Sequence, residues 1–235
     1  LRLQGTPDNP IVIMGSGHLE STFDGESSGF ALRLQECEYV IIENVGVTNA
    51  SPYGIDGREH YNTDETGRPT ARDELAEGIL VRGGNDITIR ESRFFDIATR
   101  GILVGGGTDG ITVVHNLFIR VGDDTAGADL AIGRPVEHVT VRENLMAGNI
   151  DGVMFEGPDG TNLVERNFIV FHRWEDGIDL KMVSRMENDP EPDDRWTTVR
   201  RNVVYAHKSQ FSGITIQISS DNVKVYENII HGHGG

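Results

Sequence analysis

The chain has 235 residues, a length typical of one domain. Lys and Arg total 21 against 37 Asp and Glu, and the net charge of −16 argues against a general nucleic-acid binder, which needs a basic surface. No apolar run approaches the roughly 18 residues of a membrane-spanning helix, so no membrane partner is expected. The single cysteine, Cys37, excludes an internal disulfide or a cysteine metal cage, and 29 glycines indicate a turn-rich β protein.

One pattern recurs along the chain: an apolar, alternating run that ends in Asn, followed by a second apolar run. In chain order the pattern ends at Asn44, Ser92 (in place of Asn), Asn116, Asn144, Asn167, Asn202 and Asn228. Most intervals are about 25 residues, and the longer ones before Ser92 and Asn202 hold insertions. The repeat predicts a single all-β domain over residues 1–235, a parallel β-solenoid with three short strands in each of about seven or eight turns.

A glycine-led strand is expected in most turns, at residues 78–81, 101–104, 152–155, 177–180 and 213–216, with 129–132 in the same place. Alternation along the strands separates inward apolar residues from outward ones. The repeated Asn residues are expected to stack inside the solenoid, where their amides satisfy the backbone of a tight turn. We assign them a structural role.

Function is therefore expected on the outward face and in the loops. Insertions 49–76 and 184–195 flank the outer face of the glycine-led strands and are expected to wall a groove for an elongated ligand. Several charged residues gather on two adjacent turns of that face: Asp151, Glu156, Asp176, Asp179 and Lys181. Glu156 is expected one strand spacing from Lys181, as a surface salt bridge or as part of a site.

The four carboxylates form an oxygen-rich set of the kind that Ca²⁺ prefers, so they are the expected metal ligands. Lys181 becomes a candidate general base if its pKa is lowered, although neighbouring carboxylates would raise that pKa. The turn before this strand adds His172, Arg173, whose guanidinium pairs with carboxylates, and Trp174, whose indole stacks on sugars. We assign Arg173 to catalysis with Lys181, and His172, Trp174, Arg134 and Gln217 to substrate binding.

At these residues the sequence resembles the pectate-lyase-like superfamily of right-handed parallel β-helices. Residues 5–13 and 23–25 are similar to the first turns of many polysaccharide-active members, and residues 175–181 resemble the strand that carries the basic lysine in polysaccharide lyase families six and nine. The resemblance implies Ca²⁺-assisted β-elimination on a uronic-acid polymer, with Lys181 as base and Asp151, Asp176 and Asp179 as calcium ligands. Family six places an arginine on the turn after the lysine. Gln217 stands there in this chain, so Arg173 or Arg201 would have to replace it.

Three other functions remain open. Glycoside hydrolases of this fold use motifs that resemble Asn62-Thr63-Asp64, Asp123-Asp124 and Gly232-His233-Gly234, but these lie several turns apart, too far for a carboxylate pair. The segment Tyr53-Gly54-Ile55-Asp56 with His60 resembles uronan C5-epimerases. A non-catalytic glycan-binding or structural solenoid would need no Lys181.

The acidic polysaccharide expected as partner implies a secreted, periplasmic or cell-surface protein. No signal peptide is recognised in the segment, which opens within the pattern at Leu1. The sequence does not indicate an oligomeric state.

Overall fold

The computed structural model describes residues 1–17, 20–26, 29–50, 76–122, 127–147, 151–158, 160–171, 176–181, 183, 195–206, 212–217, 220 and 222–232. Regular structure in these ranges consists of β-strands alone. The same ranges hold no helix long and apolar enough to cross a membrane.

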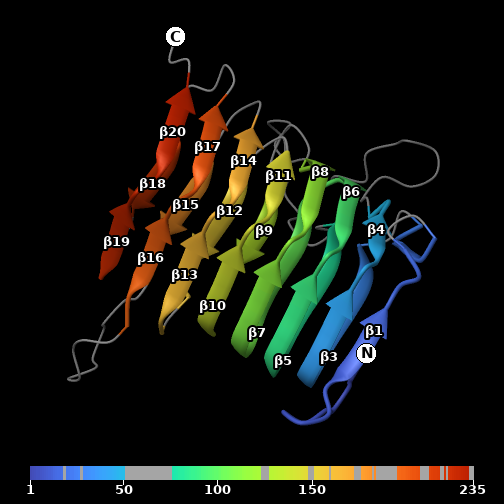
Figure 1. Cartoon of the computed structure of the whole chain (residues 1–235). Coiled ribbons are helices and arrows are strands. Elements are labelled where there is room, and N and C mark those ends of the chain that lie inside the picture. The colour runs from blue at the N-terminus through green and yellow to red at the C-terminus, as the bar shows by residue number, and fades with distance from the viewer. Residues whose placement is uncertain are drawn as a thin grey trace, which may run out of the picture.

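Within these ranges, twenty strands follow one another (Figure 1). They are β1 (Ile11–Met14), β2 (Thr22–Asp24), β3 (Phe30–Glu43), β4 (Gly46–Thr48), β5 (Glu77–Arg90), β6 (Arg93–Ile97), β7 (Arg100–Val114), β8 (Leu117–Val121), β9 (Ala128–Ile132), β10 (Val136–Arg142), β11 (Leu145–Ala147), β12 (Asp151–Glu156), β13 (Asn162–Glu165), β14 (Phe168–Phe171), β15 (Ile178–Lys181), β16 (Thr197–Arg200), β17 (Val203–Ala206), β18 (Ile214–Gln217), β19 (Val223–Tyr226) and β20 (Ile229–Gly232).

The strands form a coil with three faces, and they stack in register from one end to the other (Figure 1). The 8-stranded sheet takes one short strand from each turn, in the order β2-β4-β6-β8-β11-β14-β17-β20. The 12-stranded sheet covers the other two faces, because β7 pairs with β9 through its first half and with β10 through its second half. Every pairing between these strands is parallel, which confirms the predicted β-helix.

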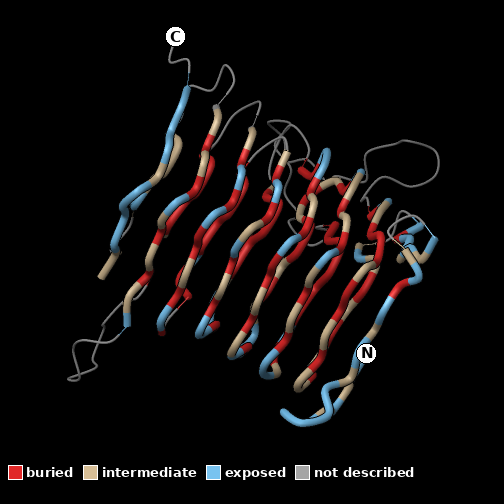
Figure 2. Tube along the Cα trace, viewed as in Figure 1, coloured by how far each residue is buried: buried red, intermediate tan, exposed pale blue. Residues whose placement is uncertain are grey.

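The core runs through the centre of the coil (Figure 2). Phe94 and Phe118 stack on neighbouring turns with ring centroids 4.6 Å apart, and both are fully buried. Each such side chain contributes about 1.5–3 kcal/mol when removed from water. The inward residues of the last turn, such as Ile216 and Ile230, are about half exposed because β18 and β20 each pair with a strand on one side only.

The Asn residues form the internal ladder that the repeat predicts. The side-chain oxygen of Asn144 accepts hydrogen bonds from the backbone N–H and the amide of Asn116, at 2.9 and 3.1 Å. The same pattern continues through Asn167 and Asn202 to Asn228. Stacking lets each amide satisfy the turn of the preceding rung.

The prediction that Asn44 belongs to the Asn ladder is wrong. Asn44 adopts a left-handed conformation (φ 58°), like His115 and Glu143, which stand just before ladder positions. The ladder position of this turn is Val45, whose N–H meets the Ser92 hydroxyl at 3.4 Å. Asparagine tolerates the left-handed region better than most residues, so its type alone did not distinguish these two adjacent places.

Candidate active site

The outer face of the glycine-led strands carries the charged residues that the sequence singled out. Strand pairing places Glu156 beside Lys181, and Lys181 beside Gln217, on β12, β15 and β18. Asp179 lies between Met154 and Thr215 in the next column. The predicted positions of Glu156 and Gln217 on the turns beside Lys181 are confirmed, because neighbouring rungs repeat the same positions at about 4.8 Å.

Lys181 is the centre of this arrangement. Its ammonium Nζ lies 2.6 Å from the Asp179 Oδ2, and the two side chains are 22% and 3% exposed. The Gln217 Nε2 donates to the other oxygen of Asp179 at 2.8 Å. The buried carboxylate therefore orients Lys181, whose side chain stays partly exposed. The ion pair of Lys181 is thus with Asp179 on its own strand β15, in place of the expected salt bridge with Glu156.

The surroundings of Lys181 keep it charged at neutral pH. Partial burial lowers its pKa, but the hydrogen bond and charge of Asp179, together with the charges of Asp151 and Glu156, outweigh burial and raise the pKa above its ordinary value. The sign of this shift was left open by the sequence. In the free protein Lys181 is therefore a cation, and its neutral form is a strong base.

Asp151 and Asp176 occupy the turn that enters the same face, and both are buried. The Asp151 Oδ1 accepts the backbone N–H of Asp176 at 2.8 Å, and the Asp176 Oδ1 accepts that of Ser212 at 2.7 Å. These carboxylates thus form a second ladder from rung to rung, comparable with the Asn ladder.

This arrangement does not fit the expected calcium ligand set. Both oxygens of Asp179 already contact protein donors, and one oxygen each of Asp151 and Asp176 is used by the backbone. No three of the four carboxylates, Glu156 included, bring ligand atoms within 4.8 Å of one another. Calcium binding stays a prediction, and we derive no step through it.

Arg134 and Arg201, two arginines named in the sequence analysis, lie in the described part of the chain. Arg134 follows β9 and is exposed, and its side chain crosses Gly157 on the next turn, where a Cβ would stand 2.0 Å from the Arg134 Nε. Gly157 also has φ +84°, so a side chain there would be strained as well as obstructed. Arg201 lies at the corner between β16 and β17 and pairs with Glu227 at 2.7 Å. It therefore does not replace the arginine missing beside Lys181.

The remaining predicted residues lie outside the described part of the chain. They are His172, Arg173 and Trp174, most of the insertions 49–76 and 184–195, and the motifs at 53–56, 60, 62–64, 123–124 and 233–234. Their assignments stay predictions.

Sequence reasoning missed a buried ion pair on the same face. Glu77, at the start of β5, pairs with the Arg100 guanidinium of the next turn at 3.5 Å, and the side chains are 7% and 16% exposed. Burial outweighs the charges of Arg100 and Arg82 and raises the pKa of Glu77 to about 7. Both residues directly precede a glycine-led strand, in the place that Asp151 takes on β12. The sequence could have indicated this pair, because the same repeat position holds an acidic residue in one turn and a basic residue in the next.

Solved structures show where else this fold is found. An alginate lyase from Paenibacillus sp. str. FPU-7 is 14% identical, with 100% of this chain and 85% of that chain covered and a TM-score of 0.53. A GH136 lacto-N-biosidase from Eubacterium ramulus is 14% identical, with 99% of this chain and 59% of that chain covered and a TM-score of 0.26. At 14% identity, the likeness to the alginate lyase concerns the fold alone. The TM-score of the lacto-N-biosidase is too low for that structure to carry an argument.

No curated protein matches the chain. A family model described as "Right handed beta helix region" matches residues 11–169 and also residues 77–235. These two matches together span the coil from β1 onward, in agreement with the parallel strand pairing. The chain therefore belongs to the right-handed β-helix family.

Proposed function

We propose that the chain is a polysaccharide lyase that cleaves a uronic-acid-containing polymer by β-elimination, with Lys181 as the catalytic base. The observation that carries the proposal is the position of Lys181 on the outer face, where its side chain is partly exposed and its ammonium contacts the buried carboxylate of Asp179. The fold shared with an alginate lyase supports the same reading. A polymer substrate also implies a secreted or cell-surface protein.

The reaction requires a base that takes the proton from C5 of the uronate. The fraction of Lys181 that is neutral, which is small at neutral pH because its pKa is raised, accepts that proton. The C5–H electrons then form the C4–C5 double bond, and the C4–O bond breaks. The departing oxygen takes a proton from the new ammonium or from water. Asp179 stabilises the ammonium as it forms, because its carboxylate lies within hydrogen-bond distance.

Substrate binding falls to the polar groups around Lys181. Arg134 is exposed on the preceding turns, and a guanidinium pairs with a uronate carboxylate through two parallel hydrogen bonds. Glu156 is exposed beside Lys181 and can accept hydrogen bonds from sugar hydroxyls. Gln217 is directed to Asp179, so its role is to orient the base.

The test is the ultraviolet absorbance of the unsaturated uronate product with a panel of uronic-acid polymers, each with calcium and with a chelator. We expect a rise with the wild type and none with Lys181→Ala. Lys224→Ala is the matched control, because Lys224 lies 3.7 Å above the Trp196 ring on another strand, β19, and should keep full activity.

A flat trace from the folded wild type on every polymer would refute the elimination. Release of reducing ends without absorbance would indicate a glycoside hydrolase, and a change of uronate configuration without cleavage would indicate a C5-epimerase. Binding without any of these products would indicate a non-catalytic glycan-binding protein. The chelator arm tests the calcium prediction separately.

A further inference from the structure

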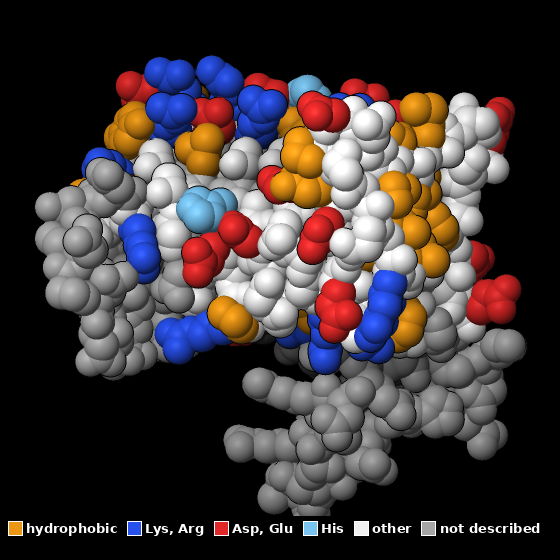
Figure 3. All heavy atoms as spheres, turned by 90° about the horizontal axis from the view of Figure 1, so that it is seen from below, with side chains coloured by type: hydrophobic (Ala, Val, Ile, Leu, Met, Phe, Trp, Pro, Cys, Tyr) orange, Lys and Arg blue, Asp and Glu red, His pale blue; other side chains and the backbone are white. Residues whose placement is uncertain are grey.

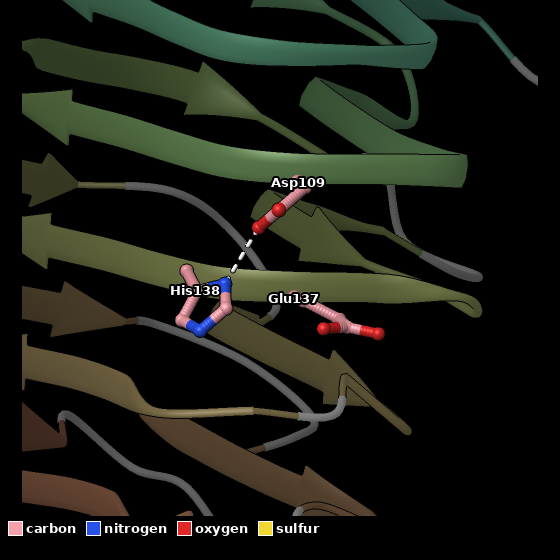
Figure 4. A group of neighbouring side chains, drawn as sticks. All are labelled: Asp109, Glu137 and His138. Carbon is pink, nitrogen blue, oxygen red and sulfur yellow. Dashed lines mark hydrogen bonds and ion pairs between the residues drawn. The ribbon is translucent and has the colours of Figure 1, made fainter.

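Three metal-ligating side chains lie close together on a different part of the coil, at the corner where the glycine-led face turns into the next face. Asp109 lies in β7, and Glu137 and His138 lie in β10 (Figure 4). Their ligand atoms all lie within 4.8 Å of one another, and the His138 Nδ1 is 2.6 Å from the Asp109 Oδ1. All three are exposed, so an ion from solution can reach them.

The backbone holds the two carboxylates side by side. Asp109 and Glu137 are direct partners in the parallel pairing of β7 with β10, so their side chains leave the same surface at about the 4.8 Å strand spacing. Like charges at directly opposed positions repel each other. A cation between the two carboxylates would remove this repulsion.

Elsewhere this protein supplies that cation from an arginine on a neighbouring turn. Acidic residues are paired in this way in Glu43–Arg90, Asp96–Arg120, Glu143–Arg166, Glu165–Arg200 and Glu227–Arg201. Within the described ranges neither Asp109 nor Glu137 forms an ion pair with Lys or Arg, and Asp109 meets only the imidazole of His138. On the face seen in Figure 3, acidic side chains lie beside a histidine, and most Lys and Arg side chains lie toward the edges of the surface.

We propose that Asp109, Glu137 and His138 bind a divalent transition-metal ion, with Zn²⁺ as the best match. Two carboxylate oxygens and one imidazole nitrogen form a three-ligand set that leaves a further position for water. Imidazole selects Zn²⁺, Cu²⁺ or Ni²⁺ over Ca²⁺ and Mg²⁺, which prefer oxygen ligands alone. The ion would supply the positive charge that an arginine supplies at the other pairs.

The test is a calorimetric titration of the full chain with Zn²⁺, followed by Co²⁺ loading and visible absorption to report the coordination. His138→Gln and the double variant Asp109→Asn/Glu137→Gln should each lose one zinc equivalent or weaken it about tenfold or more. His115→Gln is the matched control. His115 makes the same 2.6 Å contact with Glu143, but Arg166 already lies at that carboxylate.

Loss of one equivalent in both test variants, with the control unchanged, would establish the site. Zinc binding that is equal in all variants would overturn the proposal, as would a wild type that binds no zinc. A loss in the His115 variant equal to that in the His138 variant would also overturn it, because it would show unspecific histidine binding. Far-ultraviolet circular dichroism checks that each variant is folded.

Discussion

Removing one amide from the middle of the Asn ladder should destabilise the whole coil. In Asn167→Ala, the buried Asn144 loses the acceptor of its backbone N–H at 3.1 Å and of its amide at 3.0 Å. The carbonyl of Val141 loses its amide donor at 3.0 Å. Each of these three buried groups costs about 1–3 kcal/mol when it is left unsatisfied, so the free energy of unfolding should fall by roughly 3–9 kcal/mol.

Urea unfolding followed by circular dichroism measures this loss, and Asn228→Ala is the matched control. Asn228 makes the same type of bonds at the last ladder position, but it is only partly buried, so water can replace its amide. We expect a loss of about 1 kcal/mol there. Equal losses in the two variants, or a loss under about 1 kcal/mol in Asn167→Ala, would refute the reasoning that burial of the ladder makes it costly to break.

Three further predictions concern pH and packing. Because the pKa of Glu77 is raised to about 7 from 4.5, the folded state holds more protons between these values and loses up to about 3 kcal/mol of stability as the pH rises through them. Glu77→Gln should remove this slope in urea unfolding at pH 5 and pH 8, and an unchanged slope would contradict the assignment. The hydrogen bond and charge of Asp179 raise the pKa of Lys181. Asp179→Asn should therefore shift the rise of kcat/KM with pH toward lower pH in the absorbance assay. A rise that stays at the same pH would mean that Lys181 is not the base. Gly152→Ala would place a Cβ 2.5 Å from the Ile169 Cγ2 and should lower the thermal midpoint, whereas a stable variant would show that the turn can shift.

The sequence predicted the coil because its regularities are local. Alternating apolar residues and a repeated turn residue recur wherever a rung recurs, so strand positions and inward faces could be read from spacing. The columns that join Glu156, Lys181 and Gln217 followed from the same repetition. The exception, Asn44, failed because two adjacent turn positions accept the same residue type.

What each polar side chain contacts was decided by the tertiary structure. Asp151 and Asp176 were expected to bind calcium with Asp179, yet they accept backbone N–H groups of the following rung. The contact between Asp179 and Lys181, which determines the direction of the lysine pKa shift, depends on how two side chains on one strand turn toward each other.

The sequence alone therefore determined the right-handed β-helix, the order of its rungs and the column in which Lys181 stands. The three-dimensional structure decided that Asp151 and Asp176 each accept a backbone N–H, that Glu77 and Arg100 form a buried pair, and that Asp109, Glu137 and His138 lie close together. The physical reason is that stacking repeats backbone positions at a constant spacing, whereas the hydrogen bonds and charges of a side chain depend on its orientation and burial.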